Sequence, residues 1–337
     1  MRCAELPLCL LSLGALLQRG MGLNATLAAT FGNRTGDYVV SLTMAGGLGN
    51  QLFQLFAILS YGIAHPRATV ILPYTGDHIY ERPSYWHSFF KSIAPLTTID
   101  APIGPVLANE VLGNFSSYSD PSCCRYSPLP EPSDQNLVLH GFFQSFRYFQ
   151  NYSEEILEKL NTRKFQREVR VEFDRYFASS NGPSSPPPIT VSLHFRLGDY
   201  KTKTQYHPLQ KNHYYHHALQ SLMAETRAVN RTLRVLYFCE TEDVHVVVER
   251  VKALSLDFPA PGVEFVRVDD TIPDWKQMLL MSLCDDNIIA NSTFSWWSAF
   301  LNLSPAKRVF YPATWFGEHG PRVQLADFFP ASWVRLD

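Results

Sequence analysis

Apolar positions recur along this chain with two periods, and each period predicts one kind of element. Residues 38–44 form a short β-branched run that enters the glycine-rich segment 46–51, after which apolar residues recur at helical spacing to residue 63. This order of strand, glycine turn and helix is typical of the opening βα unit of a nucleotide-binding type of fold. Further along this half we predict strands at 69–72 and 136–139, irregular loops over 73–133 and one long amphipathic helix over 154–176.

The alternation of strands and helices restarts after residues 181–188, a run rich in proline and serine that is typical of a linker. Predicted strands follow at 189–193, 233–238, 263–268, 287–290 and 308–311, with helices at 214–228, 244–254, 275–284 and 293–301 between them. Strands and helices that alternate at this spacing form parallel sheets covered by helices. The sequence therefore predicts an α/β fold of two facing Rossmann-like domains, residues 24–180 and 189–337.

Composition agrees with two packed domains and narrows the class of partner. The chain has 337 residues, of which 46% are hydrophobic and 18% charged, and its formal net charge is -2. That length exceeds what one core usually fills, and the composition is globular. A nucleic-acid partner would need a dense basic face, so we predict none, and an anionic ligand must be held by a few placed residues.

The amino terminus predicts entry into the secretory pathway. Arg2 precedes an apolar run over residues 6–17, which is shorter than the roughly twenty residues of a membrane span and typical of a signal-peptide core. We interpret residues 1–23 as a signal peptide or a signal anchor, and the sequence leaves cleavage open.

Sequons and cysteines fit the same compartment. The chain has seven Asn-x-Ser/Thr sequons, where roughly two are expected by chance, and Pro305 weakens the one at Asn302. Outside the amino-terminal segment no two cysteines stand at Cys-x-x-Cys spacing, so the sequence predicts no structural metal site and leaves disulfide pairing open. We predict glycosylation at Asn24, Asn33, Asn114, Asn151 and Asn230, and the cysteines are Cys123, Cys124, Cys239 and Cys284.

The segment Val191–Tyr200 carries the clearest chemistry. Its apolar run ends abruptly in His194, Arg196 and Asp199, which a buried strand would deliver into the crevice beyond its carboxyl end, where open α/β sheets bind ligands. A guanidinium there can fork onto phosphate oxygens, so Arg196 predicts a phosphate-bearing ligand. Two plainer interpretations stay open, in which Arg196 forms a structural ion pair with Asp199 and His194 is a structural histidine.

The turn Gly46–Gln51 is a second candidate for anion binding. It lacks the spacing of the dinucleotide fingerprint and the Lys-Ser/Thr of a P-loop. A close turn at a helix amino terminus can still present backbone N–H groups to a phosphate or sugar, and Asn50 adds a side-chain donor and acceptor. A glycine turn needed only for packing is the alternative.

A third candidate is the segment Asn287–Trp297, in which a predicted strand runs into helix-capping residues. Ser292 or Thr293 at the cap would expose N–H groups and a helix dipole suited to a diphosphate. Plain capping is the alternative, since the aromatic residues that follow fall at helical spacing and are typical of a core. The sequon at Asn291 lies in this motif, so we expect it to be unglycosylated.

Together these three segments resemble the inverting α-1,2-fucosyltransferases that act on galactosides. The matching landmarks are Gly46–Gln54, the run from His194 to Tyr200, and Cys284–Trp297, within a likeness that spans about residues 39–333. The resemblance implies a glycosyltransferase of the two-Rossmann, GT-B type that uses no metal or other cofactor. It also implies transfer of L-fucose from GDP-β-L-fucose, with inversion, to the 2-hydroxyl of a terminal β-galactoside on a glycoprotein or glycolipid.

The resemblance also implies roles for residues and domains. Arg196 would be catalytic together with His194 and Asp199, the first domain would lie on the acceptor side, and the second would bind the GDP-sugar. The protein would work in the Golgi lumen, held in the Golgi membrane as a single-pass type II protein or secreted. Donor contacts are implied for Gly47, Gly49, Asn50, Gln51, Arg196, Ser292, Thr293 and Phe294.

One residue departs from the family pattern, because Leu197 stands where the family usually has a second Arg. This departure motivates an alternative, a related transferase with a changed donor or acceptor. A further alternative is a secreted glycan-binding protein without catalysis, which the presence of the motif residues disfavours. The general base is left unassigned among Asp77, His78 and His140.

Overall fold

The computed structural model of the chain describes residues 38–337 apart from 74–75, 77, 80–81, 97–114, 123, 134, 179–186, 227–230, 261 and 322–324. Contacts within the chain define two compact units, Met1–Leu160 with Leu325–Phe328, and Asn161–Gln324 with Phe329–Asp337. The division falls before the predicted boundary at residue 180. Gln166 explains the difference, because its buried amide donates to Ser282 and to the Leu301 carbonyl and so ties its helix to the second unit.

Two predicted segments fall on residues that the structure does not describe. The predicted targeting segment, residues 1–23, lies outside the described residues, and so does most of the predicted linker, of which Pro187 and Pro188 are described. Among the helices of the described residues, none has the length and apolar character needed to cross a membrane.

The first unit is built on a parallel four-stranded sheet with the order β2-β1-β6-β5. The predicted opening βα unit is confirmed, because β1 (Tyr38–Leu42) leads through a glycine turn into the largely buried helix α3 (Leu48–Ala64). The strand β5 (Ser116–Ser119) lies in a region that we predicted to be irregular, and its polar, mostly exposed residues explain why no apolar pattern marked it. The unit also contains β2 (Ala68–Val70), β3 (His78–Ile79), β4 (Arg82–Pro83), β6 (Leu137–His140), η1 (Lys91–Leu96), η2 (Phe146–Tyr148) and α5 (Ser153–Lys159).

The prediction of one continuous helix over 154–176 is wrong. The structure has α5, then α6 (Thr162–Glu172), then the short 3-10 helix η3 (Asp174–Tyr176). The break lies at Asn161, whose φ of 54° is left-handed and interrupts the helical backbone. Asn adopts this conformation more readily than most residues. The apolar spacing continues across the break because the segments on both sides present a buried face.

The second unit is a parallel six-stranded sheet with the order β12-β11-β10-β7-β8-β9. Starting at β7, the chain adds β8 and β9 on one side, then returns to add β10, β11 and β12 on the other side. This is the order of a doubly wound Rossmann sheet, and its switch point lies between β7 and β10. The strands are β7 (Ile189–His194), β8 (Leu233–Phe238), β9 (Val263–Arg267), β10 (Asp286–Ile288), β11 (Val309–Pro312) and β12 (Val334–Leu336).

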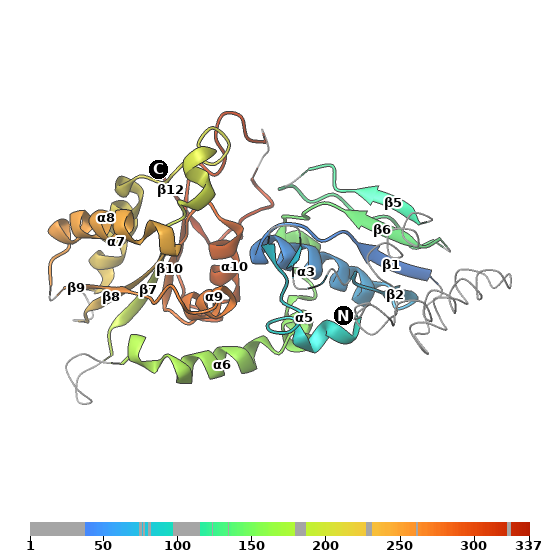
Figure 1. Cartoon of the computed structure of the whole chain (residues 1–337), viewed down its shortest axis with the longest axis horizontal. Coiled ribbons are helices and arrows are strands. Elements are labelled where there is room, and N and C mark those ends of the chain that lie inside the picture. Colours follow the sequence, from blue (N-terminus) through green and yellow to red (C-terminus); the bar gives the residue numbers. More distant parts are fainter. Residues whose placement is uncertain are drawn as a thin grey trace, which may run out of the picture. The chain divides into compact units, whose positions relative to one another are not determined.

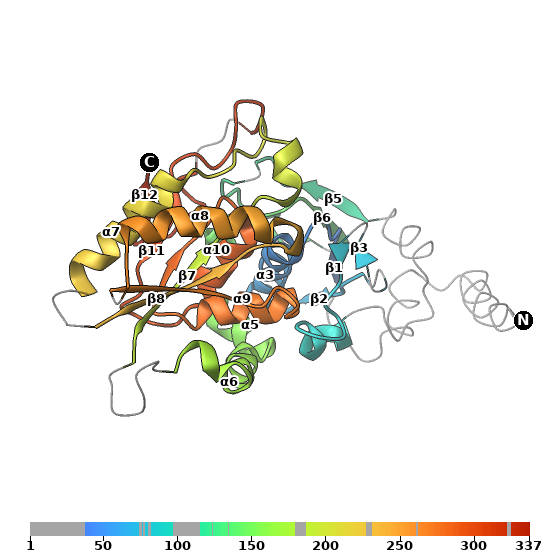
Figure 2. The ribbon, with the colours of Figure 1, turned by 60° about the vertical axis from the view of Figure 1, so that its left-hand side comes forward.

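The predicted α/β class is confirmed, and so are the five strands predicted for this half, whose ends differ by a residue or two. The short strand β12 was not predicted, since two of its three residues are exposed. Figures 1 and 2 show α7 and α8 on one face of the sheet and α9 with α6 beneath the other. The helices are α7 (Asn212–Thr226), α8 (Val244–Asp257), α9 (Asp274–Ser282) and α10 (Thr293–Leu301).

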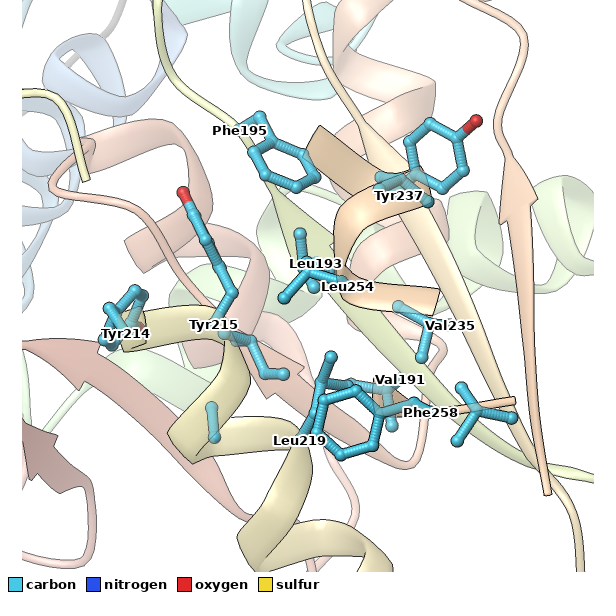
Figure 3. Packing of buried hydrophobic residues seen from close by; sticks show 14 of the residues in the cluster. Val191, Leu193, Phe195, Tyr214, Tyr215, Leu219, Val235, Tyr237, Leu254 and Phe258 are labelled. Atoms are coloured by element: carbon cyan, nitrogen blue, oxygen red, sulfur yellow. The ribbon is translucent and has the colours of Figure 1, made fainter. Parts of the chain in front are cut away.

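The core on the α7 and α8 face follows the two-residue period of the strands. Leu193 on β7 and Val235 on β8 are completely buried, and they belong to one cluster with Leu219 of α7 and Leu254 of α8, whose side chains Figure 3 shows. Alternate residues of β7 point to opposite faces, so Ser192 and His194 belong to the other face of the sheet. Each fully buried leucine of this kind contributes about 1.5–3 kcal/mol by leaving water.

Leu193→Ala tests this packing. We expect the free energy of unfolding to fall by about 2–5 kcal/mol, because the substitution leaves a cavity at the centre of the sheet. The matched control is Leu256→Ala on α8, where the side chain is 83% exposed and the change should stay within about 0.5 kcal/mol. Urea unfolding of both variants measures the difference, and equal losses would contradict the described core.

Candidate active site

The switch point of the second unit brings together two of the three motifs. His194 is the last residue of β7, and α10 begins five residues after the end of the adjacent strand β10. The rings of His194 and Phe294 have their centroids 5.6 Å apart. Parallel sheets bind ligands beyond the carboxyl ends of their strands at this point. The position of the site is therefore set by the strand order.

His194 is a buried, neutral imidazole at this edge. It is 7% exposed, and its Nδ1 has no hydrogen-bond partner within the described part of the chain. Burial, helped by the charge of Arg196, lowers the pKa of His194 to about 3. The ring is therefore uncharged near neutral pH, where one nitrogen donates and the other accepts a hydrogen bond.

Arg196 is held between two carboxylates. Its Nη1 donates to Glu240 and its Nη2 donates to Asp199, and the side chain is 15% exposed. Burial alone would lower the pKa of Arg196, but Glu240, Tyr200 and Asp199 outweigh it and raise that pKa. The ion pair with Asp199 considered from the sequence is thus present, with Glu240 as a second partner. The side chain stays charged and is fixed in orientation.

A buried carboxylate fixes the turn that follows Arg196. Asp243, completely buried in the 3-10 helix η6 (Thr241–Asp243), accepts from the Gly198 N–H at 2.6 Å and from Lys201 Nζ at 2.6 Å. Gly198 has a φ of 36°, and a Cβ on it would collide with the Glu240 carboxylate. The turn is η4 (Gly198–Thr202) and carries Asp199.

Sequence reasoning missed Glu240 and Asp243. The signal was present, because both follow the end of the predicted strand 233–238 and so lie at the same edge as Arg196. Acidic residues after a strand are common in solvated loops, which is why the two were passed over.

The amino terminus of α10 is capped as the sequence predicts. Ser292 is the N-cap, its Oγ accepts from the Phe294 N–H at 3.3 Å, and the first turn contains no acidic residue. Trp297 and Leu301 are buried, as expected for core residues, whereas Phe294, also expected in the core, is only half-buried and lies against His194. The positive end of the helix dipole therefore meets the edge that carries His194.

Asn291 joins this cap to its surroundings. Its Nδ2 donates to the carbonyls of Pro208 at 3.0 Å and Trp315 at 3.1 Å, and Tyr200 donates to its backbone carbonyl at 3.1 Å. The Cζ of Arg196 lies 4.9 Å from the centre of the Tyr200 ring, so Tyr200 links the guanidinium to the cap. Asn291 is 2% exposed with its amide nitrogen engaged, which agrees with its being unglycosylated.

Of the five predicted glycosylation sites, the structure describes one. Asn151 lies in an exposed turn. The predicted sites at Asn24, Asn33, Asn114 and Asn230 lie outside the described residues.

Leu197 lies in the core. It is 4% exposed and belongs to the cluster that contains Phe195 and Tyr215. The departure from the family pattern therefore falls, in this chain, on a packed apolar position rather than at the edge with His194.

The glycine turn lies in the first unit, at the carboxyl edge of β1. Gly46 has a φ of 79°, Gly47 is the N-cap of α3 with open space where a Cβ would point, and Gly49 is buried in its first turn. Asn50 Oδ1 accepts from Gln144 Nε2 at 2.9 Å. Gln51 is completely buried, and its amide donates to the carbonyls of Gly46 and Pro83 at 2.9 Å each, which braces the turn.

The strand edge of the first unit is braced by Gln54, which sequence reasoning did not single out. Its side chain accepts from the Ala45 N–H at 3.0 Å and donates to the Gly141 carbonyl at 2.8 Å. Among the three base candidates, His140 ends β6 at this edge, with its Nδ1 3.2 Å from Thr43 Oγ1. His78 lies exposed on β3, and Asp77 lies outside the described residues.

The residues that could bind a metal ion are scattered in the described part of the chain. No group of three or more His, Cys, Asp or Glu side chains there could hold a metal ion. Cys239 and Cys284 are buried thiols, and burial raises the pKa of Cys239 to about 12. Cys123 lies outside the described residues.

Comparison with known proteins points to one family. The family model described as glycosyl transferase family 11 matches residues 116–334, more than half of the chain. A galactoside 2-alpha-L-fucosyltransferase of Caenorhabditis elegans is 25% identical over 338 residues, which cover 87% of this chain and 75% of that protein. An alpha-1,2-colitosyltransferase of Escherichia coli is 24% identical over 314 residues, which cover 89% of this chain and 99% of that protein.

The chain is also similar to a third relative over a shorter stretch and to a solved structure. The O-antigen biosynthesis glycosyltransferase WbnK of Escherichia coli is 32% identical over 152 residues, and the match spans 44% of each chain, less than half of that relative. The structure of a mutant of Arabidopsis thaliana FUT1 in complex with GDP has a TM-score of 0.46 and 11% identity, covering 90% of this chain and 77% of that one.

His194 predicts a pH dependence of stability. Because its folded pKa of about 3 lies below the ordinary 6.5, the unfolded chain binds a proton between these values that the folded chain does not. His194 therefore lowers stability as the pH falls from about 6.5 towards 3. We expect His194→Gln to lose about 1–2 kcal/mol less than the wild type between pH 7.5 and pH 5.0, measured by urea unfolding.

The control for this measurement is His245→Gln, which changes an exposed histidine of α8. That variant should follow the wild type at both pH values. A His194→Gln variant that does so as well would show that His194 titrates alike in the folded and unfolded chain.

Proposed function

Because the chain belongs to glycosyl transferase family 11, we propose that it transfers L-fucose from GDP-β-L-fucose to the 2-hydroxyl of a terminal β-galactoside on glycoprotein or glycolipid glycans. One observation carries this proposal. His194, the charged Arg196 and the amino terminus of α10 come together at the switch point of one Rossmann sheet. These are groups that bind a diphosphate.

In this mechanism the galactoside hydroxyl attacks the anomeric carbon of fucose and gives its proton to a general base, and the bond from that carbon to the GDP oxygen breaks on the opposite side. The leaving GDP gains negative charge on its β-phosphate. Arg196, the α10 dipole and an N–H of neutral His194 stabilise that charge, and they need little reorganisation because they are already held in place. Asp199 orients Arg196, and we propose that the reaction needs no metal ion.

Acceptor binding and the location of the enzyme belong to the same proposal. We assign the acceptor to the first unit, where His140 remains a candidate base because it lies at the carboxyl edge of the sheet. The apolar run and sequons of the amino-terminal part favour the Golgi lumen, with residues 1–23 as a signal anchor or a cleaved signal peptide.

A second candidate is a related transferase that uses another deoxysugar donor. It rests on the relative named for colitosyl transfer, which matches 89% of this chain. Leu197 gives it less support than the sequence alone indicated, because that side chain packs in the core. Thermal shifts with GDP, GDP-fucose, GDP-mannose and UDP-galactose test the donor. A larger shift with GDP-fucose than with GDP supports the first candidate, and a shift with GDP that fucose does not increase supports a different donor sugar. No response to any nucleotide would favour a glycan-binding protein without catalysis.

Arg196→Ala tests the proposed function. We expect kcat/KM for GDP-fucose with a β-galactoside acceptor to fall by about 100-fold or more, since removing one preformed charge donor from such a site has an effect of this order. Arg196→Lys keeps the charge but loses the planar fork, so it should restore only part of the rate. Release of GDP measures turnover.

The matched control is Arg335→Ala, which removes an exposed arginine of β12 in the same unit. It should leave the rate unchanged. Near-normal turnover by Arg196→Ala would overturn the assignment of this site.

A further inference from the structure

Glu240 lies at the edge of the sheet where the proposed donor binds. The strand β8 is the neighbour of β7, it ends at Phe238, and Glu240 follows two residues later. Its side chain is 35% exposed, so the carboxylate reaches the surface of this edge while it accepts from Arg196. In a doubly wound sheet, an acidic residue after the second strand is well placed to bind a ribose hydroxyl.

The charges around Arg196 indicate a second task for Glu240. Asp199 already pairs with this guanidinium, and Lys203 lies 3.5 Å from the same carboxylate. Glu240 thus adds a negative charge beyond what one guanidinium needs. A carboxylate repels phosphate oxygens, so its place here suits a part of the ligand that donates hydrogen bonds. A carboxylate offers about four acceptor positions, and Arg196 donates to one of the two Glu240 oxygens, Oε1.

Gly198 shows that the carboxylate's position is built into the fold. Its backbone takes a left-handed φ of 36°, and an added Cβ would meet the Glu240 carboxylate and Arg196 Nη1. Glycine therefore serves both the turn and the close approach of Glu240.

We propose that Glu240 accepts a hydrogen bond from a ribose hydroxyl of the bound nucleoside diphosphate. Ribose is the part of the ligand that fits, because its hydroxyls donate hydrogen bonds and it is joined covalently to the diphosphate. Glu240 in turn accepts a hydrogen bond from Arg196, the residue proposed to hold the diphosphate. Glu240 is then a specificity-determining residue for ribonucleotides. The inference rests on the proposed use of a nucleotide donor and adds the group that recognises its sugar.

The test is a double-mutant type of cycle that removes the Glu240 carboxylate by mutation and the ribose hydroxyl by use of a deoxy nucleotide, each separately. Calorimetry on the full chain compares the Kd of GDP with those of 2′-deoxy-GDP and 3′-deoxy-GDP, for the wild type and for Glu240→Ala. We expect the wild type to bind GDP about tenfold or more tightly than at least one deoxy nucleotide, as for a lost hydrogen bond to a charged group. In Glu240→Ala that ratio should shrink to about twofold or less.

Comparing ratios separates recognition from support of Arg196, because a disturbed guanidinium weakens all three nucleotides alike. Glu240→Gln, which keeps a neutral acceptor, should give an intermediate ratio. The control Glu242→Gln removes an exposed carboxylate of η6 and should keep the wild-type ratio. A ratio unchanged in Glu240→Ala, or a wild type that binds all three nucleotides equally, would overturn the inference alone. A wild type that binds no GDP would overturn the proposed function and this inference with it.

Discussion

The ion-paired guanidinium of Arg196 is the interaction on which the site depends. A charged side chain that is only 15% exposed is stable only with partners. Here Asp199 comes from its own turn, while Glu240 comes from the segment that follows the neighbouring strand. These two directions fix the plane of the guanidinium before any ligand arrives. Asp243 fixes the backbone of the same turn from beneath. The arrangement is preorganised, which is the condition under which a cation stabilises developing charge most effectively.

The register of β7 against β10 sets where His194 lies relative to α10. Ser192 and Asn287 are partners in the pairing of β7 and β10, and the Asn287 amide donates to the Ser192 hydroxyl at 2.7 Å. Thr190 Oγ1 donates to Asp285 at 2.8 Å on the same pair of segments. Each contact joins residues far apart in the sequence. The Asn287–Ser192 pair is buried and the Thr190–Asp285 pair is partly buried, and polar pairs of this kind oppose a slip of register. As a result His194 lies level with the start of α10.

Elements marked by a local apolar pattern were predicted from the sequence, whereas features that depend on contacts with distant residues were missed. The strands β7 and β8 were found because apolar residues predominate in them, and β10 was found from the apolar run Ile288–Ala290 that begins at its last residue. By contrast, β5 reads Ser-Ser-Tyr-Ser and pairs only at the sheet edge. The break at Asn161 was missed because helical spacing does not reveal a single left-handed residue. Glu240 is placed in the site by its ion pair with Arg196, more than forty residues earlier, and no pattern within its own segment shows that contact.

The position of Leu197 in the structure changes the interpretation of its departure from the family pattern. Its place beside Arg196 in the sequence suggested a charge missing from the ligand site. The two-residue period of β7 gives a different answer, since Leu193 and Phe195 point into the core and Leu197 joins the same cluster. A hydrophobic residue there belongs in this buried cluster, whereas an arginine would need a new partner for its charge. The change at this position therefore bears first on stability, while Arg196 and Glu240 carry the polar chemistry of the edge.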